Sequence, residues 1–132
     1  MKYTLEQRKE LARRLRGEGR NCSQCVAMAF DDMTDVDAEV LARISSGFGS
    51  GIGGKGEVCG VMTGAAMVCG LVYDKLERPA LYAKVRQPLD RFEELNGSYV
   101  CQELKRPGRK PCIDLITDGV EMLHRQFEAD GF

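Results

Sequence analysis

The sequence predicts an all-α protein: a single compact multi-helix domain over residues 1–132, with a glycine-rich loop before a buried central helix. Apolar residues recur at steps of three and four, and capping residues precede several of these stretches. No two-residue alternation bounded by hairpin turns appears, so a sheet is not expected. The 132 residues suffice for one hydrophobic core, and the 43% hydrophobic and 30% charged residues are ordinary for a globular protein.

The first three expected helices each follow a capping residue. Thr4 and Asn21 are both followed three residues later by glutamine, the pairing of a capping box. Asp35 or Asp37 can cap the third helix, and Arg8 belongs to the polar face of the first. The expected spans run from Leu5 to near Gly17 and Gly19, from Cys22 to about Met33, and from Asp35 or Asp37 to Gly47.

A glycine-rich loop precedes the most apolar part of the chain. Six of the ten residues from Gly47 to Gly56 are glycine, which admits positive φ and predicts a loop that closes tightly or flexes. The segment from Glu57 to about Tyr73 is apolar on nearly every side and is expected to be the buried central helix. It is shorter than the ~20 residues that a bilayer requires. Gly60 and Gly64 are spaced to let a second backbone approach.

Two longer helices are expected in the C-terminal half. Pro79 begins one whose apolar stripe extends to Leu95, and Pro88 should kink or divide it. Asn96-Gly97 ends this helix, and Ser98 can cap a short one through Cys101 to Lys105. The last helix follows Pro111, and its apolar residues mark one buried face: Ile113, Ile116, Val120, Leu123 and Phe127.

The charge balance argues against nucleic acid as a partner. The net charge is -1, from 19 basic and 20 acidic residues, so no global field attracts nucleic acid or an anionic membrane. The segment from Met1 to Gln7 is polar and lacks the apolar core of a secretion signal. We expect a cytoplasmic protein without a membrane span.

Four of the six cysteines fall at expected helix starts: Cys22, Cys59, Cys101 and Cys112. Free N–H groups and a partial positive charge of about +0.5 at a helix start favour a thiolate. If the four starts converge, the fold gathers a ligand set for an iron–sulfur cluster or for zinc. Their spacing matches no compact ligand motif, so burial as small hydrophobic residues is the alternative.

The other two cysteines have separate interpretations. Cys25 forms Cys22-x-x-Cys25, which could be a redox pair or two ligands. Cys69 lies among apolar residues and is expected in the core. We expect no structural disulfides, because a reducing compartment is expected.

The segment Cys59-Gly60-Val61-Met62-Thr63-Gly64 resembles the redox-active prokaryotic family labelled C_GCAxxG_C_C. The resemblance covers roughly residues 5 to 125, including Asn21 to Gln24, Gly47 to Gly56, Gly97 to Cys101, and Cys112. Val61 stands where the family usually has alanine. The resemblance implies an α-helical redox protein whose four cysteines are those at the helix starts. A related domain accompanies haem in split-Soret-type cytochromes, but no CxxCH sequence is present, so haem is not expected.

The sequence thus predicts a redox or electron-transfer protein with an iron–sulfur cluster, or less favourably zinc, on the four cysteines. Without a metal, the same thiols could act in thiol–disulfide exchange, with Cys59 as nucleophile. Whether the protein is an enzyme is left open. Four glycines are expected to bring backbone amides to the cofactor: Gly54, Gly56, Gly60 and Gly64.

Two further functional classes remain open. Gly51 to Gly56 satisfies GxGxxG, but Gly56 occupies the P-loop hydroxyl position and a helix precedes the loop, which weakens the nucleotide-binding hypothesis. A basic run could instead dock an unknown redox partner: Lys105, Arg106, Arg109 and Lys110. An exposed glycine-rich helix face could support a homodimer. The single histidine, His124, is expected to serve a surface or capping role.

Overall fold

Seven α-helices form the protein in a computed structural model that describes residues 1–132, and no strand is present. The all-α prediction is therefore confirmed. The helices are α1 (Leu5–Gly17), α2 (Cys22–Ala29), α3 (Ala38–Ser45), α4 (Gly60–Val72), α5 (Arg78–Asn96), α6 (Cys101–Leu104) and α7 (Cys112–Ala129). Two short 3₁₀ turns, η1 (Asp31–Met33) and η2 (Ser46–Phe48), follow α2 and α3.

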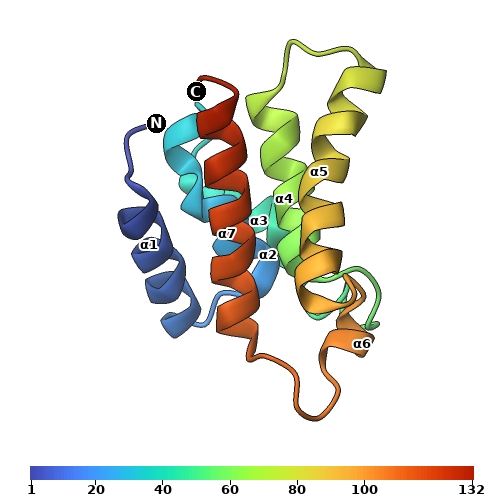
Figure 1. Ribbon diagram of the computed structural model, residues 1–132. Coiled ribbons are helices and arrows are strands. Elements are labelled where there is room, and N and C mark those ends of the chain that lie inside the picture. Colours follow the sequence, from blue (N-terminus) through green and yellow to red (C-terminus); the bar gives the residue numbers. More distant parts are fainter.

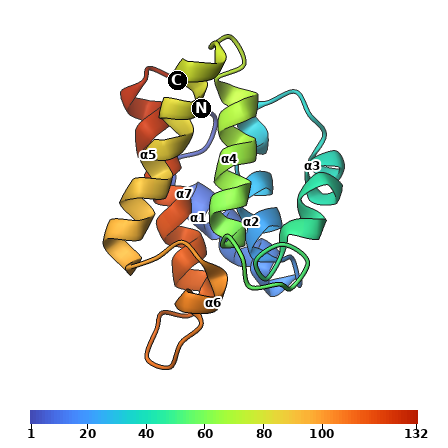
Figure 2. The same cartoon turned by 90° about the vertical axis from the view of Figure 1, so that its right-hand side faces the viewer.

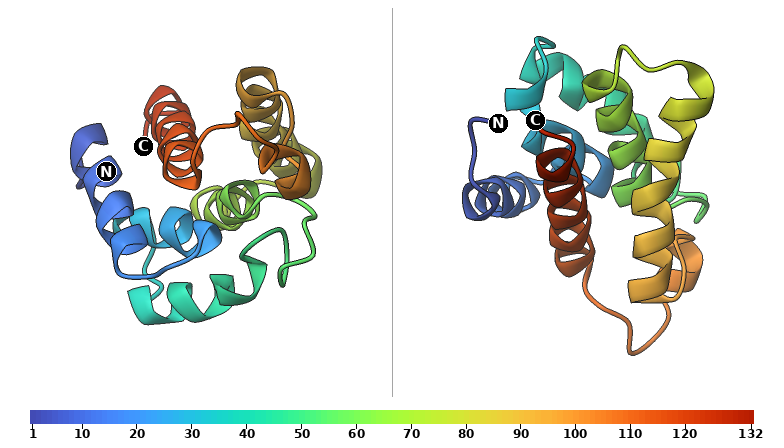
Figure 3. Two further views of the ribbon diagram at one scale, coloured as in Figure 1. Left: turned by 90° about the horizontal axis from the view of Figure 1, so that it is seen from below. Right: turned by 45° about the horizontal axis from the view of Figure 1, so that its top comes forward.

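Helix α4 is the centre of the bundle. It packs against α2, α5 and α7, and α1 covers α2 and α7 on the other side (Figures 1 and 3). Both chain termini lie at one end of the bundle, whereas α2, α4, α6 and α7 all begin at the opposite end (Figures 1 and 2). No helix combines the length and the apolar composition needed to cross a membrane. The largest fully buried apolar side chains include Phe30, Met62, Phe92, Ile116, Leu123 and Phe127.

The capping residues predicted for the first three helices begin them as expected. Ser98 does not cap α6, because Val100 is the N-cap there and Ser98 Oγ accepts from the Val100 N–H instead. Thr4 Oγ1 accepts from the Gln7 N–H at 3.1 Å, and the Gln7 side chain accepts from the Thr4 N–H at 2.9 Å. Asn21 forms the same reciprocal pair at the start of α2. Asp37 accepts from the N–H of Glu39 and fixes the start of α3. These local bonds set where α1, α2 and α3 begin.

Helix α2 ends four residues before the predicted end at Met33, because the chain turns at Phe30. The 3₁₀ turn that follows directs the Asp32 carboxylate toward Arg8, a residue of the predicted polar face of α1. The tertiary ion pair therefore replaces a further turn of helix.

Pro88 lies inside one continuous helix α5, so the expected division of this helix is wrong. Proline has no N–H to donate to the carbonyl four residues earlier, which here belongs to Lys84. The Gln126 side chain from α7 donates to that carbonyl instead, with an N–O distance of 3.0 Å. The buried Pro88 is tolerated because α7 satisfies the carbonyl that it leaves free.

Two glycines let α2 approach the backbone of α4, as their spacing predicted. A Cβ on Gly64 would lie 2.8 Å from the Ser23 carbonyl oxygen and 3.0 Å from the Val26 Cβ. A Cβ on Gly60 would lie 3.0 Å from both the Cys22 Cβ and the Ser23 nitrogen. The close contact of α2 with α4 therefore depends on the absence of side chains at both positions.

We predict that Gly64→Ala lowers the free energy of unfolding by about 1–3 kcal/mol, because the new methyl group meets backbone atoms that cannot rotate away. Gly70→Ala is the matched control in the same helix. No atom lies within 4 Å of the Cβ that it would add, so this change should stabilise the protein by about 0.5–1 kcal/mol. Urea unfolding checks both values, and equal effects would contradict the packing argument.

Arg8 is fully buried and forms a network that the sequence did not reveal. Its guanidinium pairs with Asp32, whose side chain is 1% exposed, and lies over the Phe30 ring at 4.3 Å. Its Nη1 also donates to the Ala29 carbonyl at 2.7 Å, and its Nε donates to His124 Nδ1 at 3.0 Å. Burial and the nearby Arg8 lower the pKa of His124. His124 is thus a buried neutral acceptor, and the expected surface or capping role is wrong.

We predict that Asp32→Asn destabilises the protein by about 3–5 kcal/mol, because the Arg8 cation would stay buried without a counter-charge. Glu10→Gln is the control, since it removes a carboxylate from an exposed pair with Arg13 and should cost under about 0.5 kcal/mol. Urea unfolding at neutral pH measures the difference. An Asp32→Asn variant as stable as the control would show that Arg8 does not need this partner.

Candidate functional site

Four cysteines stand at four helix starts, as the sequence predicted. Cys22, Cys101 and Cys112 are the first residues of α2, α6 and α7, and Cys59 immediately precedes α4. All six cysteines of the chain are free thiols. The four helix starts lie together at the end of the molecule opposite the termini (Figure 2).

One small cavity of about 60 Å³ is lined by all four of these cysteines. The remaining lining residues are Arg16, Asn21, Ser50, Gly60, Leu104, Lys105 and Leu115. Cys59 and Cys101 are 4% and 6% exposed, whereas Cys22 and Cys112 are half-buried. Thiols that are far apart in the sequence therefore share one space, with Cys22 and Cys112 nearer to solvent.

Backbone pairing holds Cys59 beside Cys101. Val58 and Val100 form an isolated antiparallel bridge just before the two helices. The Cys59 N–H donates to the Tyr99 carbonyl at 2.8 Å, and the Cys101 N–H donates to the Glu57 carbonyl at 2.7 Å. The positions of these two cysteines are thus fixed by main-chain hydrogen bonds.

The glycine-rich loop closes against Cys101 as a left-handed turn. Five consecutive residues from Ser50 to Gly54 have positive φ, between 51° and 79°. A Cβ on Gly51 would lie 2.8 Å from the Cys101 Cβ and 2.5 Å from the Glu57 nitrogen, so only glycine fits there. Ser50 lines the cavity from this loop. The loop also follows a helical segment, whereas a P-loop follows a strand.

The structure places the four glycines expected near a cofactor in different surroundings. Gly60 lines the cysteine cavity, and Gly64 packs against α2. Gly54 faces open space, and Gly56 lies against Gln102. Only Gly60 is therefore brought to the thiols.

Burial opposes ionisation of Cys22 and Cys59. Burial raises the pKa of Cys22 to about 12, with further increases from Cys112 and Cys59 and an opposing effect of Arg16. Burial likewise raises the pKa of Cys59 to about 11, although the N–H groups of Val61 and Met62 favour its thiolate. The N–H groups at the helix start therefore favour the Cys59 thiolate as expected, but burial has the larger and opposite effect on its pKa.

We predict that alkylation of Cys22 and Cys59 in the metal-free protein accelerates about tenfold per pH unit from pH 7 to pH 10, because only the thiolate reacts. Iodoacetamide labelling followed by peptide mass spectrometry measures this rate at each residue. An exposed cysteine in a short peptide is the control, and its rate should level off near pH 9. A plateau by pH 8 at Cys59 would show an activated thiol instead.

Cys25 and Cys69 lie in the core and away from the cavity. Both are fully buried, and burial raises their pKa values to about 11 and about 12 respectively. The Cys25 sulfur is 3.6 Å from the Arg20 carbonyl oxygen. The core placement expected for Cys69 is confirmed, and Cys25 does not join Cys22 at the cavity.

The donors at the cavity suit a soft metal. Four cysteines line it, and no residue with a carboxylate or an imidazole does. Thiolates select zinc, copper(I) and iron–sulfur clusters, whereas calcium and magnesium need several oxygen ligands. No group of three or more His, Cys, Asp or Glu side chains is already arranged to hold a metal ion. Binding would therefore involve rotation of the cysteine side chains toward the centre.

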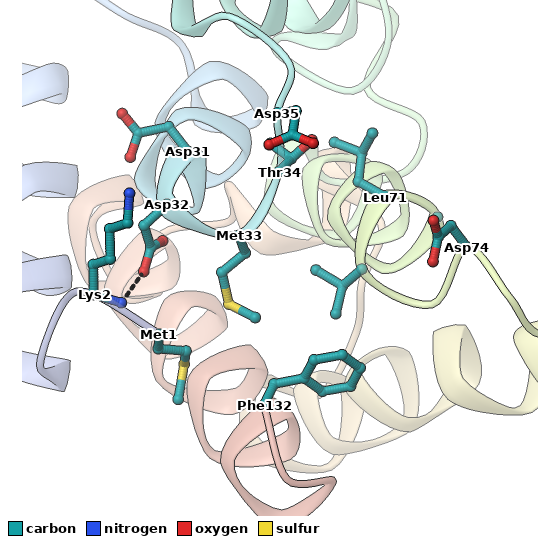
Figure 4. A pocket seen from close by; sticks show the side chains of 12 residues that line it. Met1, Lys2, Asp31, Asp32, Met33, Thr34, Asp35, Leu71, Asp74 and Phe132 are labelled. Atoms are coloured by element: carbon teal, nitrogen blue, oxygen red, sulfur yellow. Dashed lines mark hydrogen bonds between the residues drawn. The ribbon is translucent and has the colours of Figure 1, made fainter.

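A second cavity, of about 690 Å³, lies at the end with the termini (Figure 4). Its lining includes four aspartates: Asp31, Asp32, Asp35 and Asp74. Asp32 is already engaged there, since it accepts from the Lys2 N–H at 2.9 Å. No cysteine lines this cavity, so it is separate from the thiol site.

Fold and site together define a small all-α protein with four cysteines around one cavity. The model of the family described as "Putative redox-active protein (C_GCAxxG_C_C)" matches residues 20–126, and the chain belongs to this family. The chain is also similar to an uncharacterized protein of Archaeoglobus fulgidus, at 27% identity over 89% of this chain and 91% of the relative. No solved structure matches the chain.

Proposed function

We propose that the protein is an electron-transfer protein in which Cys22, Cys59, Cys101 and Cys112 bind an iron–sulfur cluster. The observation that carries this proposal is the single cavity lined by these four cysteines. The family is described as redox-active, and this favours an iron–sulfur cluster over zinc, because zinc has no redox chemistry. Four cysteines are also the usual ligand set of a [2Fe–2S] or [4Fe–4S] cluster.

The surroundings of the thiols support a negatively charged centre. Each cysteine lies where a helix starts, so free backbone N–H groups are near the sulfur. Arg16 and Lys105 line the same cavity and add positive charge. When bound, the cluster would supply one-electron chemistry. The thiols must lose their protons to become ligands, so binding should release protons and weaken at low pH.

The protein's own side chains would control water and access at the site. The buried Leu104 and Leu115 form apolar walls beside the cysteines. The Gly51 turn covers Cys101, whereas Cys22 and Cys112 remain partly open to solvent. Low solvent exposure and hydrogen bonds to sulfur are the means by which proteins set a cluster potential.

Anaerobic reconstitution with iron and sulfide tests the proposal. We predict a coloured protein with bound iron and acid-labile sulfide, because all four ligands face one cavity. Serine at any of the four cysteines should lower the iron content at least about threefold. Cys69→Ala is the matched control, because Cys69 is buried away from the cavity and should leave the iron content unchanged. Circular dichroism of each variant checks that the helices are intact.

Two outcomes would contradict the cluster. One is a colourless protein after reconstitution with all thiols reduced at the start. The other is a zinc-loaded protein that excludes iron under the same anaerobic conditions. If diamide then oxidised Cys22 and Cys112 to a disulfide, with loss of two electrons and two protons, thiol–disulfide exchange would be the better account.

A further inference from the structure

The thiol cavity has one open side, formed where α2 and α7 begin. Cys59 and Cys101 are almost fully buried, whereas Cys22 and Cys112 are half-buried. A partner that exchanges electrons with the site therefore approaches past Cys22 and Cys112. We refer to Cys22 and Cys112, together with Arg16 and Lys105, as the cavity mouth.

The charge at the cavity mouth is entirely positive. Arg16 and Lys105 are exposed, and neither forms a salt bridge. By contrast, three lysines elsewhere in the chain are paired with acids: Lys9, Lys84 and Lys110. No acidic residue lines the cavity. Two cations without counter-charges therefore face any molecule that comes to the thiols.

Only part of the basic run noted in the sequence contributes to this charge. Lys110 pairs with Asp118, and Arg109 donates to the Asn96 carbonyl at 2.6 Å. Lys105 alone of the run lines the cavity. Arg16, which the run did not include, comes from α1 and supplies the second cation.

Two exposed apolar side chains belong to segments that adjoin the thiol cavity. Ile52 is 42% exposed and lies two residues from Ser50, a cavity-lining residue. Leu95 is 55% exposed, although the apolar stripe of α5 predicted it to be buried. It lines a neighbouring cavity that shares Leu104 and Leu115 with the thiol cavity. Protein interfaces combine an apolar core with a polar, solvent-accessible rim.

We propose that the cavity mouth, together with Ile52 and Leu95 on the adjoining segments, forms a docking surface for an acidic protein partner. The thiol cavity of about 60 Å³ is far smaller than the roughly 300–1,000 Å³ of sites that enclose small organic ligands. An anionic partner therefore contacts the rim from outside, where the apolar side chains add contact area. This inference rests on the proposed function, because electron transfer requires a partner to approach the cysteines.

The test uses the metal-free full chain, so it does not depend on cluster assembly. N-ethylmaleimide, a neutral reagent, labels Cys22 and Cys112 at pH 8, and peptide mass spectrometry gives the rates. Polyglutamate serves as the probe for an acidic surface, and polylysine serves as its opposite. We predict that polyglutamate slows labelling at least about threefold at low salt and that about 0.5 M salt removes the effect. Polylysine should not slow it.

Charge-reversal variants locate the effect. Arg16→Glu with Lys105→Glu should abolish protection by polyglutamate, because the cavity mouth becomes negative. Lys75→Glu with Arg78→Glu is the matched control, with the same change in net charge on two exposed residues, one in the loop after α4 and one at the start of α5, away from the cysteines. This variant should retain the protection.

Three results would overturn the docking surface. The first is no protection, or equal protection by both polymers. The second is protection that survives in the Arg16→Glu, Lys105→Glu variant. The third is equal protection by citrate at the same carboxylate concentration, which would identify a site for small anions. A failed cluster reconstitution would leave all three measurements interpretable, because they use reduced, metal-free thiols.

Discussion

The cysteine site depends on how closely α2 approaches α4. A Cβ on Gly60 would lie only 3.0 Å from the Cys22 Cβ. Because Gly60 has no side chain, Cys22 can lie near Cys59. Gly119 has the same role between α7 and α4, because a Cβ there would lie 2.2 Å from the Val61 side chain. The pairing of Val58 with Val100 then adds Cys101. The lack of a side chain at Gly60 and Gly119 and the bridge between Val58 and Val100 thus bring four thiols that are distant in the sequence to one cavity.

The same close packing determines the chemistry of the thiols. By removing water, it raises the pKa values of Cys22 and Cys59 above those of ordinary cysteines, despite the N–H groups at their helix starts. A bound cation reverses this balance, because a coordinating thiol loses its proton outright. This chemistry is consistent with the metal centre that we propose. Arg16 and Lys105 leave positive charge at its open side.

Local signals in the sequence predicted much of the fold. Thr4, Asn21 and Pro111 determine helix starts through short-range bonds and backbone restriction, so the cysteines could be placed on helices. Long-range contacts could not be predicted in this way. The partner that buries Arg8 comes from a turn 24 residues later, and the acceptor for its Nε comes from α7. Only the packed structure shows that the four helix starts share one end.

Cadmium binding tests the convergence of the thiols most directly, because cadmium is a soft, colourless ion without redox chemistry of its own. Titration under reducing conditions, followed by the sulfur-to-cadmium charge-transfer absorbance, counts the thiolates bound to each ion. The structure predicts one cadmium per chain with four thiolates, and three thiolates after serine replaces any one of Cys22, Cys59, Cys101 or Cys112. Binding by two or fewer thiolates, or binding unaffected by these replacements, would contradict a shared site.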